Sequence, residues 1–249
     1  MRKNLLLAVL ALLAACPMQA QQLSNMGFDT WSKQGGVWYP YAKDAPESRK
    51  VWDSANKGLS LLGVNTTVPE YKHTAVSGKA AAKVQSRKVL WAFVAGNLFT
   101  GRFIRVVDMS GAEMEFGAPF TARPKSLTGY YHYQPETINY AQDPYLHLKG
   151  KQDVGRIEVI LMDCAEPRHM DTTKDPFVDG DKDPHVVGHG VLDLTKATDG
   201  YVPFEIPIVY RNGKTPIFAF IFVTSSRYGA YFTGGSGSTL YVDEFRFNY

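Results

Sequence analysis

The sequence is poor in cysteine, and this shortage limits how the fold can be stabilised. Its cysteines are Cys16 and Cys164. Cys16 lies in an amino-terminal segment with the features of a leader, so only Cys164 is left as a free thiol in the rest of the chain. We therefore expect no internal disulfide, and the apolar core must supply the stability.

The sequence also lacks an excess of charge of either sign. It has 27 Lys and Arg against 24 Asp and Glu. Arg2 and Lys3 belong to the leader, which leaves 25 − 24 = +1 for the remaining chain. Basic blocks and interleaved basic and aromatic residues are missing as well. This balance argues against nucleic acid and anionic membrane surfaces as partners.

Long apolar runs are missing except at residues 5–15, which are too few to span a bilayer. Because Arg2 and Lys3 precede this run, residues 1–20 are predicted to be an export signal. Two processing routes stay open: residues 13–16 resemble a lipoprotein box ending at Cys16, whereas residues 17–20 resemble an ordinary cleavage region. The expected location is the periplasm, the outer membrane or the cell surface, with a lipid anchor at Cys16 as the only membrane contact.

What the sequence has in abundance favours strands and turns. It contains 13% aromatic residues, 22 Gly and 14 Pro, and helical apolar spacing is almost absent after residue 20. The predicted strands are 80–86, 89–95, 102–108, 126–134, 155–163, 185–193, 202–210, 216–225 and 239–248. Residues 216–225 are apolar on both parities, as in a central strand covered on both faces. The sequence predicts one all-β domain over 21–249, a two-sheet β-sandwich with jelly-roll topology.

The last predicted strand carries a carboxylate in apolar company. Strict alternation would place Asp243 on one face with Tyr241, Phe245 and Phe247. An unpaired buried charge is costly, so Asp243 needs a partner. If the first and last strands lie side by side, Asp29 and Asp243 could share a structural calcium ion. The alternative is that Asp243 pairs with an arginine or caps a backbone turn.

The loop from 226 to 238 is far longer than a hairpin turn, and it carries Tyr228 and Tyr231 before the small-residue run 234–238. Aromatic planes pack against the C–H faces of sugars, so this loop is a candidate saccharide platform. The candidate glycan-binding residues are Trp52, Asn56, Arg123, Tyr228 and Tyr231. The alternative is that the aromatics cover a sheet edge and that Arg123 ties down loops.

A glycoside hydrolase would need two carboxylates on either side of the scissile bond. The candidates are Glu113 and Glu115, which share one face of a predicted strand, and Asp163, which ends an apolar strand. The alternative interpretations are a solvated strand face for the two glutamates and a turn for Asp163. Signatures of a serine or cysteine nucleophile are missing.

The most polar segment runs from Asp171 to His189. Asp179, Asp181 and Asp183 have the spacing of a calcium loop, but the positions that require Gly and Glu hold other residues. His185 and His189 would lie about 13 Å apart on a strand. We interpret this segment as an exposed acidic loop with incidental histidines, and a weak surface calcium site is the alternative.

Several motifs resemble known families. The pair N-x-G-F-D-x-W (25–31) and STLYVDEF (238–245) resembles carbohydrate-binding jelly rolls of the galactose-binding type. Many of those proteins hold a structural calcium between such segments. The motifs VWDSANKG, AGNLFTGRF, FGAPFTARPKSLTGYYHYQP, YVPFEIPIVY and TSSRYGAYFTGGSGSTLYVDEF resemble the "putative carbohydrate metabolism domain" of exported Bacteroidetes proteins. This resemblance covers nearly the whole chain after the leader, and it implies a β-sandwich, export and a role with glycans, but no catalytic residues.

Three functions follow as hypotheses. The first is an exported protein that binds a polysaccharide or oligosaccharide. The second is a glycoside hydrolase acting on a plant or host polysaccharide. The third is a structural or adhesive surface protein whose broad faces contact other proteins.

Overall fold

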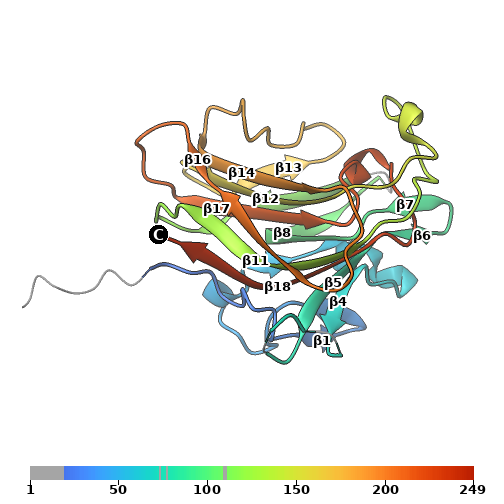
Figure 1. Ribbon diagram of the computed structural model, residues 1–249, viewed down its shortest axis with the longest axis horizontal. Helices are drawn as coiled ribbons and strands as arrows, with labels where there is room; N and C mark the ends of the chain where they lie inside the picture. The colour runs from blue at the N-terminus through green and yellow to red at the C-terminus, as the bar shows by residue number, and fades with distance from the viewer. Residues whose placement is uncertain (1–19, 73, 77, 109–110) are drawn as a thin grey trace, which may run out of the picture.

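The computed structural model describes residues 20–72, 74–76, 78–108 and 111–249, which form two β-sheets packed face to face (Figure 1). The five-stranded sheet has the order β15-β11-β18-β5-β4. The nine-stranded sheet has the order β13-β9-β8-β17-β12-β14-β16, with β10 beside β17 and β3 beside β8. The prediction of an all-β sandwich is confirmed, whereas the export signal at residues 1–20 falls almost entirely outside the described residues.

The elements of the two sheets have the following bounds. The smaller sheet contains β4 (Thr67–Glu70), β5 (Ala81–Gln85), β11 (Ser126–Gln134), β15 (Val202–Pro207) and β18 (Thr239–Asn248). The larger contains β3 (Trp52–Asp53), β8 (Asn97–Val107), β9 (Gly111–Phe116), β10 (Ala118–Pro119), β12 (Gly155–Met162), β13 (Arg168–Asp171), β14 (Val186–Leu194), β16 (Val209–Tyr210) and β17 (Phe218–Thr224). Outside the sheets lie the hairpins β1 (Ser32–Gln34) with β2 (Val37–Tyr39) and β6 (Arg87–Val89) with β7 (Ala92–Val94), and the 3-10 turns η1 (Glu47–Arg49), η2 (Ala55–Leu62), η3 (Leu146–Leu148) and η4 (Gly229–Tyr231).

The strand β17 is covered on both faces, as its sequence predicts. Ala219, Ile221 and Val223 point into the core between the sheets. Phe220 points to the opposite face, into a second apolar cluster against which Phe177 and Val178 pack from the loop between β13 and β14. A loop layer therefore closes the outer face of the larger sheet at this end.

Two predicted strands are divided in the structure. Residues 89–95 form parts of the hairpin β6-β7, because the chain turns at Leu90, whose φ is +54°. Residues 202–210 supply β15 to one sheet and β16 to the other. Pro207 offers no N–H for further pairing, and the chain crosses between the layers at Ile208, whose side chain joins the core.

A β-bulge in β18 reverses the side-chain alternation that the sequence suggests. Thr128 of β11 pairs with Arg246 and Tyr130 pairs with Asp243, so β18 has one extra residue there. Glu244 takes up the extra length with a φ of +51°. As a result Leu240 and Val242 before the bulge and Phe245 and Phe247 after it all enter the core. The prediction that Asp243 shares a face with Phe245 and Phe247 is wrong for this reason.

The amino-terminal segment runs beside the carboxyl-terminal half of β18 without forming a strand. The Gln22 side chain donates to the Phe247 carbonyl at 2.8 Å and accepts from the Phe247 N–H at 2.9 Å. The Phe245 N–H donates to the Met26 carbonyl. Asp29 therefore lies on an irregular segment rather than on the predicted first strand. Within the described ranges, the longest helical turns are far too short and polar to cross a bilayer.

Candidate functional site

Three tyrosines gather at one end of the sandwich. The Tyr145 ring centroid lies 4.5 Å from that of Tyr228 and 5.0 Å from that of Tyr231. Tyr231 keeps 45% of its surface exposed. Figure 1 shows the segments that carry them, around η3 and η4, at the same end of the molecule. We call Tyr145, Tyr228 and Tyr231 the tyrosine platform, and its rings can stack against a planar or ring-shaped ligand.

A buried carboxylate that sequence reasoning missed holds the loop of this platform in place. The Asp153 side chain is fully buried. Its Oδ2 atom accepts hydrogen bonds from Ser226 Oγ at 2.5 Å, the Gly235 N–H at 2.7 Å and Ser238 Oγ at 2.8 Å, and burial raises its pKa. A Cβ atom at Gly234 would lie 2.4 Å from the Phe93 ring. The small residues of 234–238 therefore give an ordered, latched loop rather than a flexible one.

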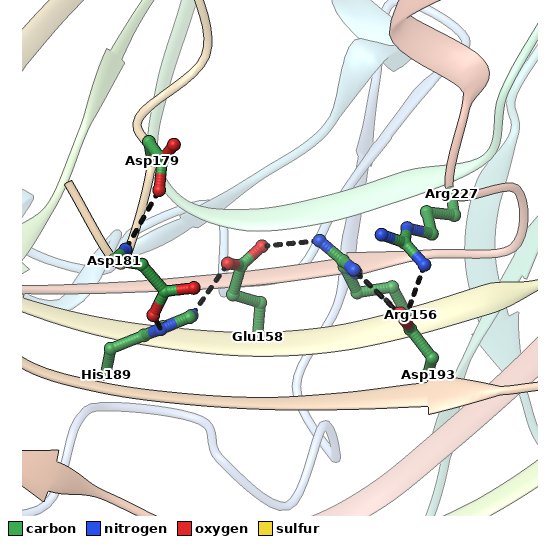
Figure 2. A network of polar contacts seen from close by, with 7 residues as sticks. All are labelled: Arg156, Glu158, Asp179, Asp181, His189, Asp193 and Arg227. Atoms are coloured by element: carbon green, nitrogen blue, oxygen red, sulfur yellow. Dashed lines mark hydrogen bonds and ion pairs between the residues drawn. The ribbon is translucent and has the colours of Figure 1, made fainter. Parts of the chain in front are cut away.

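A row of charged side chains, drawn in Figure 2, lies on the outer face of the larger sheet. Arg156 on β12 donates to Asp193 on β14 at 2.7 Å, and Arg227 donates to the same carboxylate at 2.7 Å. Arg156 also lies 3.7 Å from Glu158, which contacts His189 at 2.9 Å. We call these five residues the charged row. They present fixed donors and acceptors of the kind that sugar hydroxyls bind.

The row and the platform form one continuous surface. The Arg227 guanidinium lies 5.2 Å from the centroid of the Tyr228 ring. His189 and Asp193 are four positions apart on one strand, so the charged row is about 13 Å long in the direction of that strand. A surface of this shape suits an extended ligand.

His189 is not incidental, contrary to the sequence interpretation. Its Nε2 atom forms a hydrogen bond with Glu158 on the sheet at 2.9 Å, and its Nδ1 atom forms one with Asp181 on the loop at 3.0 Å. The hydrogen bond with Glu158, followed by that with Asp181, raises the pKa of His189 above its ordinary value. Asp179 accepts from the backbone N–H of Asp181 and Lys182. The acidic segment is thus clamped to the sheet through this histidine.

Two of the five predicted glycan-binding residues belong to the interior. Trp52 is 0% exposed and donates its indole N–H to the Ser24 carbonyl. Asn56 is 1% exposed; its amide donates to the carbonyls of Trp38 and Thr67, and its oxygen accepts from the N–H of Thr66 and Thr67. These side chains hold segments of the chain together, and the structure does not bring them to the tyrosine platform.

Arg123 lies at the other end of the sandwich from Tyr228 and Tyr231. Its guanidinium stacks 3.9 Å from the Tyr210 ring centroid and donates to the carbonyls of Asn212 and Lys214. It precedes β11, whose first residue pairs with Asn248, whereas the loop of the platform leads into the opposite end of β18. Arg123 ties down loops, and the structure does not bring it to the predicted site.

Two of the three predicted catalytic carboxylates, Glu113 and Asp163, are paired with cations. Glu113 contacts Arg105 and His169, and the hydrogen bond with His169 lowers its pKa. Glu115 lies opposite His169 and Arg102 in the registers of β9 with its neighbours. Asp163 contacts Lys214 at 2.5 Å and His185 at 3.2 Å, and the contact with Lys214 lowers its pKa. Glu113 and Asp163, held ionised by these cations, are poor general acids.

Asp29 and Asp243 come close to each other beneath the segment that follows β4. Asp243 accepts from the N–H of Ala75 and of Glu244, each at 2.8 Å, and Asp29 accepts from the N–H of Lys79 and Ala80. Burial, with smaller contributions from Glu244 and Asp29, raises the pKa of Asp243 to about 6. Calcium takes six to eight oxygen ligands. The residues that the structure describes contain no group of three or more His, Cys, Asp or Glu that could hold a metal ion, and a calcium ion shared by Asp29, Asp243 and backbone carbonyls stays an untested prediction.

 Two solved structures share the fold of this chain. The likeness concerns the fold alone. A structure described as a "putative glycoside hydrolase" from Bacteroides vulgatus superposes with a TM-score of 0.70 at 22% identity, covering 92% of this chain and 99% of the other. A second, also described as a "putative glycoside hydrolase", from Bacteroides thetaiotaomicron, gives 0.66 at 23% identity, covering 92% of this chain and 72% of the other. No curated protein matches the chain.

The sequence motifs and the sandwich agree with the result of the family comparison. The model of the family described as "Putative carbohydrate metabolism domain" matches residues 27–248, which include both sheets, the tyrosine platform and the charged row. The resemblance found in the sequence motifs is thereby confirmed. This chain belongs to the putative carbohydrate metabolism domain family.

Proposed function

We propose that this protein is an exported glycan-binding protein that holds a polysaccharide or oligosaccharide along the tyrosine platform and the charged row. The observation that carries the proposal is the continuity of the two: tyrosine rings that are half-buried or exposed lie at one end, and fixed carboxylates and guanidinium groups lie beside them. Aromatic faces bind the C–H surface of a sugar ring, and charged groups bind its hydroxyls with directional hydrogen bonds.

The rigidity of this surface supports the proposal. Asp153 latches the loop that carries Tyr228 and Tyr231, and ion pairs fix the orientation of Arg156 and Arg227. A surface that is ordered before binding loses little conformational entropy when a flexible glycan settles on it.

The test is a glycan array with the wild-type chain, followed by titration calorimetry with the polysaccharides that bind. We expect Tyr231→Ala and Tyr228→Ala each to weaken binding by about tenfold, because each removes one stacking ring. Tyr71→Ala is the matched control, since Tyr71 is 58% exposed and follows β4 in the other sheet. Absence of binding across plant and host polysaccharides would exclude the proposal.

A glycoside hydrolase is the second candidate, and one observation favours it. Asp53 is buried beside the cavity between η1, β3 and β8, and burial raises its pKa to about 6, as a general acid requires. The second carboxylate in that cavity, Glu47, is paired with Lys50 at 2.6 Å. Release of reducing ends from a bound polysaccharide, lost in Asp53→Asn, would establish hydrolysis; binding without release would leave the protein a glycan binder.

A further inference from the structure

A cavity of about 240 Å³ lies away from the tyrosine platform, on the other half of β8. Its walls include Tyr39, Tyr41, Asp53, Lys57, Arg102 and Phe103. Asn97, at the end of β8 near the platform, is six positions from Phe103, so the two surfaces are about 20 Å apart. The volume is below the range for drug-sized ligands, and it suits a single ring.

One wall of this cavity is aromatic. The rings of Tyr39 and Tyr41 have centroids 5.4 Å apart and are inclined by 32°. Both side chains are half-buried, so part of each ring remains accessible. Two neighbouring rings of this kind give a surface for the C–H face of a sugar.

The cations of the cavity outnumber the carboxylates that can neutralise them. Glu47 is engaged by Lys50 at 2.6 Å. The two oxygens of Asp53 accept from the N–H of Ser54 and of Phe103, each at 2.8 Å. In the described part of the chain neither Arg102 nor Lys57 forms an ion pair, and the contact of Lys57 with the Phe103 carbonyl is long, at 3.4 Å. Two exposed cations therefore lie at the cavity without a direct anionic partner.

We propose that this cavity binds one anionic sugar ring, with Tyr39 and Tyr41 against the ring and with Arg102 and Lys57 on its carboxylate or sulfate group. Charge-assisted hydrogen bonds from a guanidinium and an ammonium group are the strongest contacts available to such an anion. The site is separate from the tyrosine platform. The proposed ligand of the cavity is an acidic saccharide unit. This assignment does not depend on whether the tyrosine platform binds a neutral glycan.

The test is titration calorimetry of the full chain with glucuronate, galacturonate, glucose 6-sulfate and neutral glucose, at low and at high salt. We expect at least one acidic sugar to bind, glucose to bind at least about tenfold more weakly, and salt to weaken the binding. Binding of the uronates alone identifies a carboxylate ligand, and binding of the sulfate alone identifies a sulfated one. Equal binding of glucose, or no binding of any acidic sugar, would overturn the proposal.

Variants locate the binding. Arg102→Gln and Lys57→Gln change exposed side chains, and each should weaken the binding of the acidic sugar about tenfold or more. Arg105→Gln is the matched control, because Arg105 is on the same strand but pairs with Glu113 outside the cavity. Tyr231→Ala should leave this binding unchanged, which separates it from the platform. Unchanged affinity in both cavity variants would disprove the assignment, and melting curves of each variant verify that it folds.

Discussion

Asp153 shows how one buried side chain can determine whether a loop is ordered. Its oxygens accept from Ser226, Gly235, Ser238 and the N–H of Val154. Asp153→Ala would leave these buried donors without partners, so we expect a loss of about 3 kcal/mol or more in the free energy of unfolding. Urea denaturation measures it. Asp199→Ala, at an exposed position, should change stability by less than about 0.5 kcal/mol; similar losses in both variants would contradict the role of the latch.

Asp243 predicts a specific pH dependence. Its pKa is about 6 in the folded chain, above the ordinary value, because burial disfavours the charged form. The folded state therefore binds the proton more tightly, and the contribution of this group to stability is greatest below about pH 4 and is lost as the pH rises through about 6.

The comparison of the wild type with Asp243→Asn measures this contribution. The melting temperature of the variant relative to that of the wild type should increase between pH 4 and pH 7, because the variant has no charge to bury. A difference that is constant with pH would contradict it. The same melts with calcium and with a chelator test the calcium prediction, which requires a rise in the wild type that the variant lacks.

At this scale, sequence reasoning could single out candidate side chains, and their role with glycans stays a prediction. Tyr228 and Tyr231 could be found because aromatics in a long loop are conspicuous. Trp52 and Asn56 are equally suited to a sugar by residue type, but burial depends on contacts between distant segments, such as that of Asn56 with Thr67. Asp153 could not be found, because Ser226, Gly235 and Ser238, which its side chain holds together, are more than 70 positions away in the chain.

At the scale of elements, the bulge in β18 sets which side chains enter the core. Deletion of Glu244 would restore simple alternation and turn Phe245 and Phe247 away from the core. We expect this variant to be unfolded or insoluble, as judged by circular dichroism and by sedimentation. Deletion of Gly213, in an exposed turn with open space around it, should leave the fold intact. A soluble, cooperatively melting Glu244 deletion would contradict the importance of the bulge.

Most strands of the two sheets follow from local pattern. Residues 126–134 and 239–248 match β11 and β18 because both are bounded by turn residues and rich in aromatic and β-branched side chains. The bulge and the crossing between sheets at Pro207 were not predicted, because a strand that changes partner keeps an unbroken local pattern. The short strands β1 to β3 carry too few residues to show a period.

For the whole molecule we expect a monomer. Among the residues that the structure describes, the most exposed large apolar side chains are Leu61 at 99%, Trp91 at 73% and Val209 at 69%, and they lie on η2, the β6-β7 turn and β16. Side chains scattered in this way do not make an interface of the size that stable dimers bury. Sedimentation velocity at micromolar concentrations measures the mass. A stable oligomer would favour the structural or adhesive function over glycan binding.

The pairing of Gln22 with Phe247 places both ends of the described chain at the same end of the sandwich, and Figure 1 shows the segments around η3 and η4, which carry the tyrosine platform, at the other end. The ten residues of β18 that separate these ends cover about 33 Å. If the predicted lipid anchor at Cys16 is present, the proposed ligand surface would lie at the end of the sandwich away from the anchor. The length of β18 would then set the distance between the anchor and the proposed glycan site.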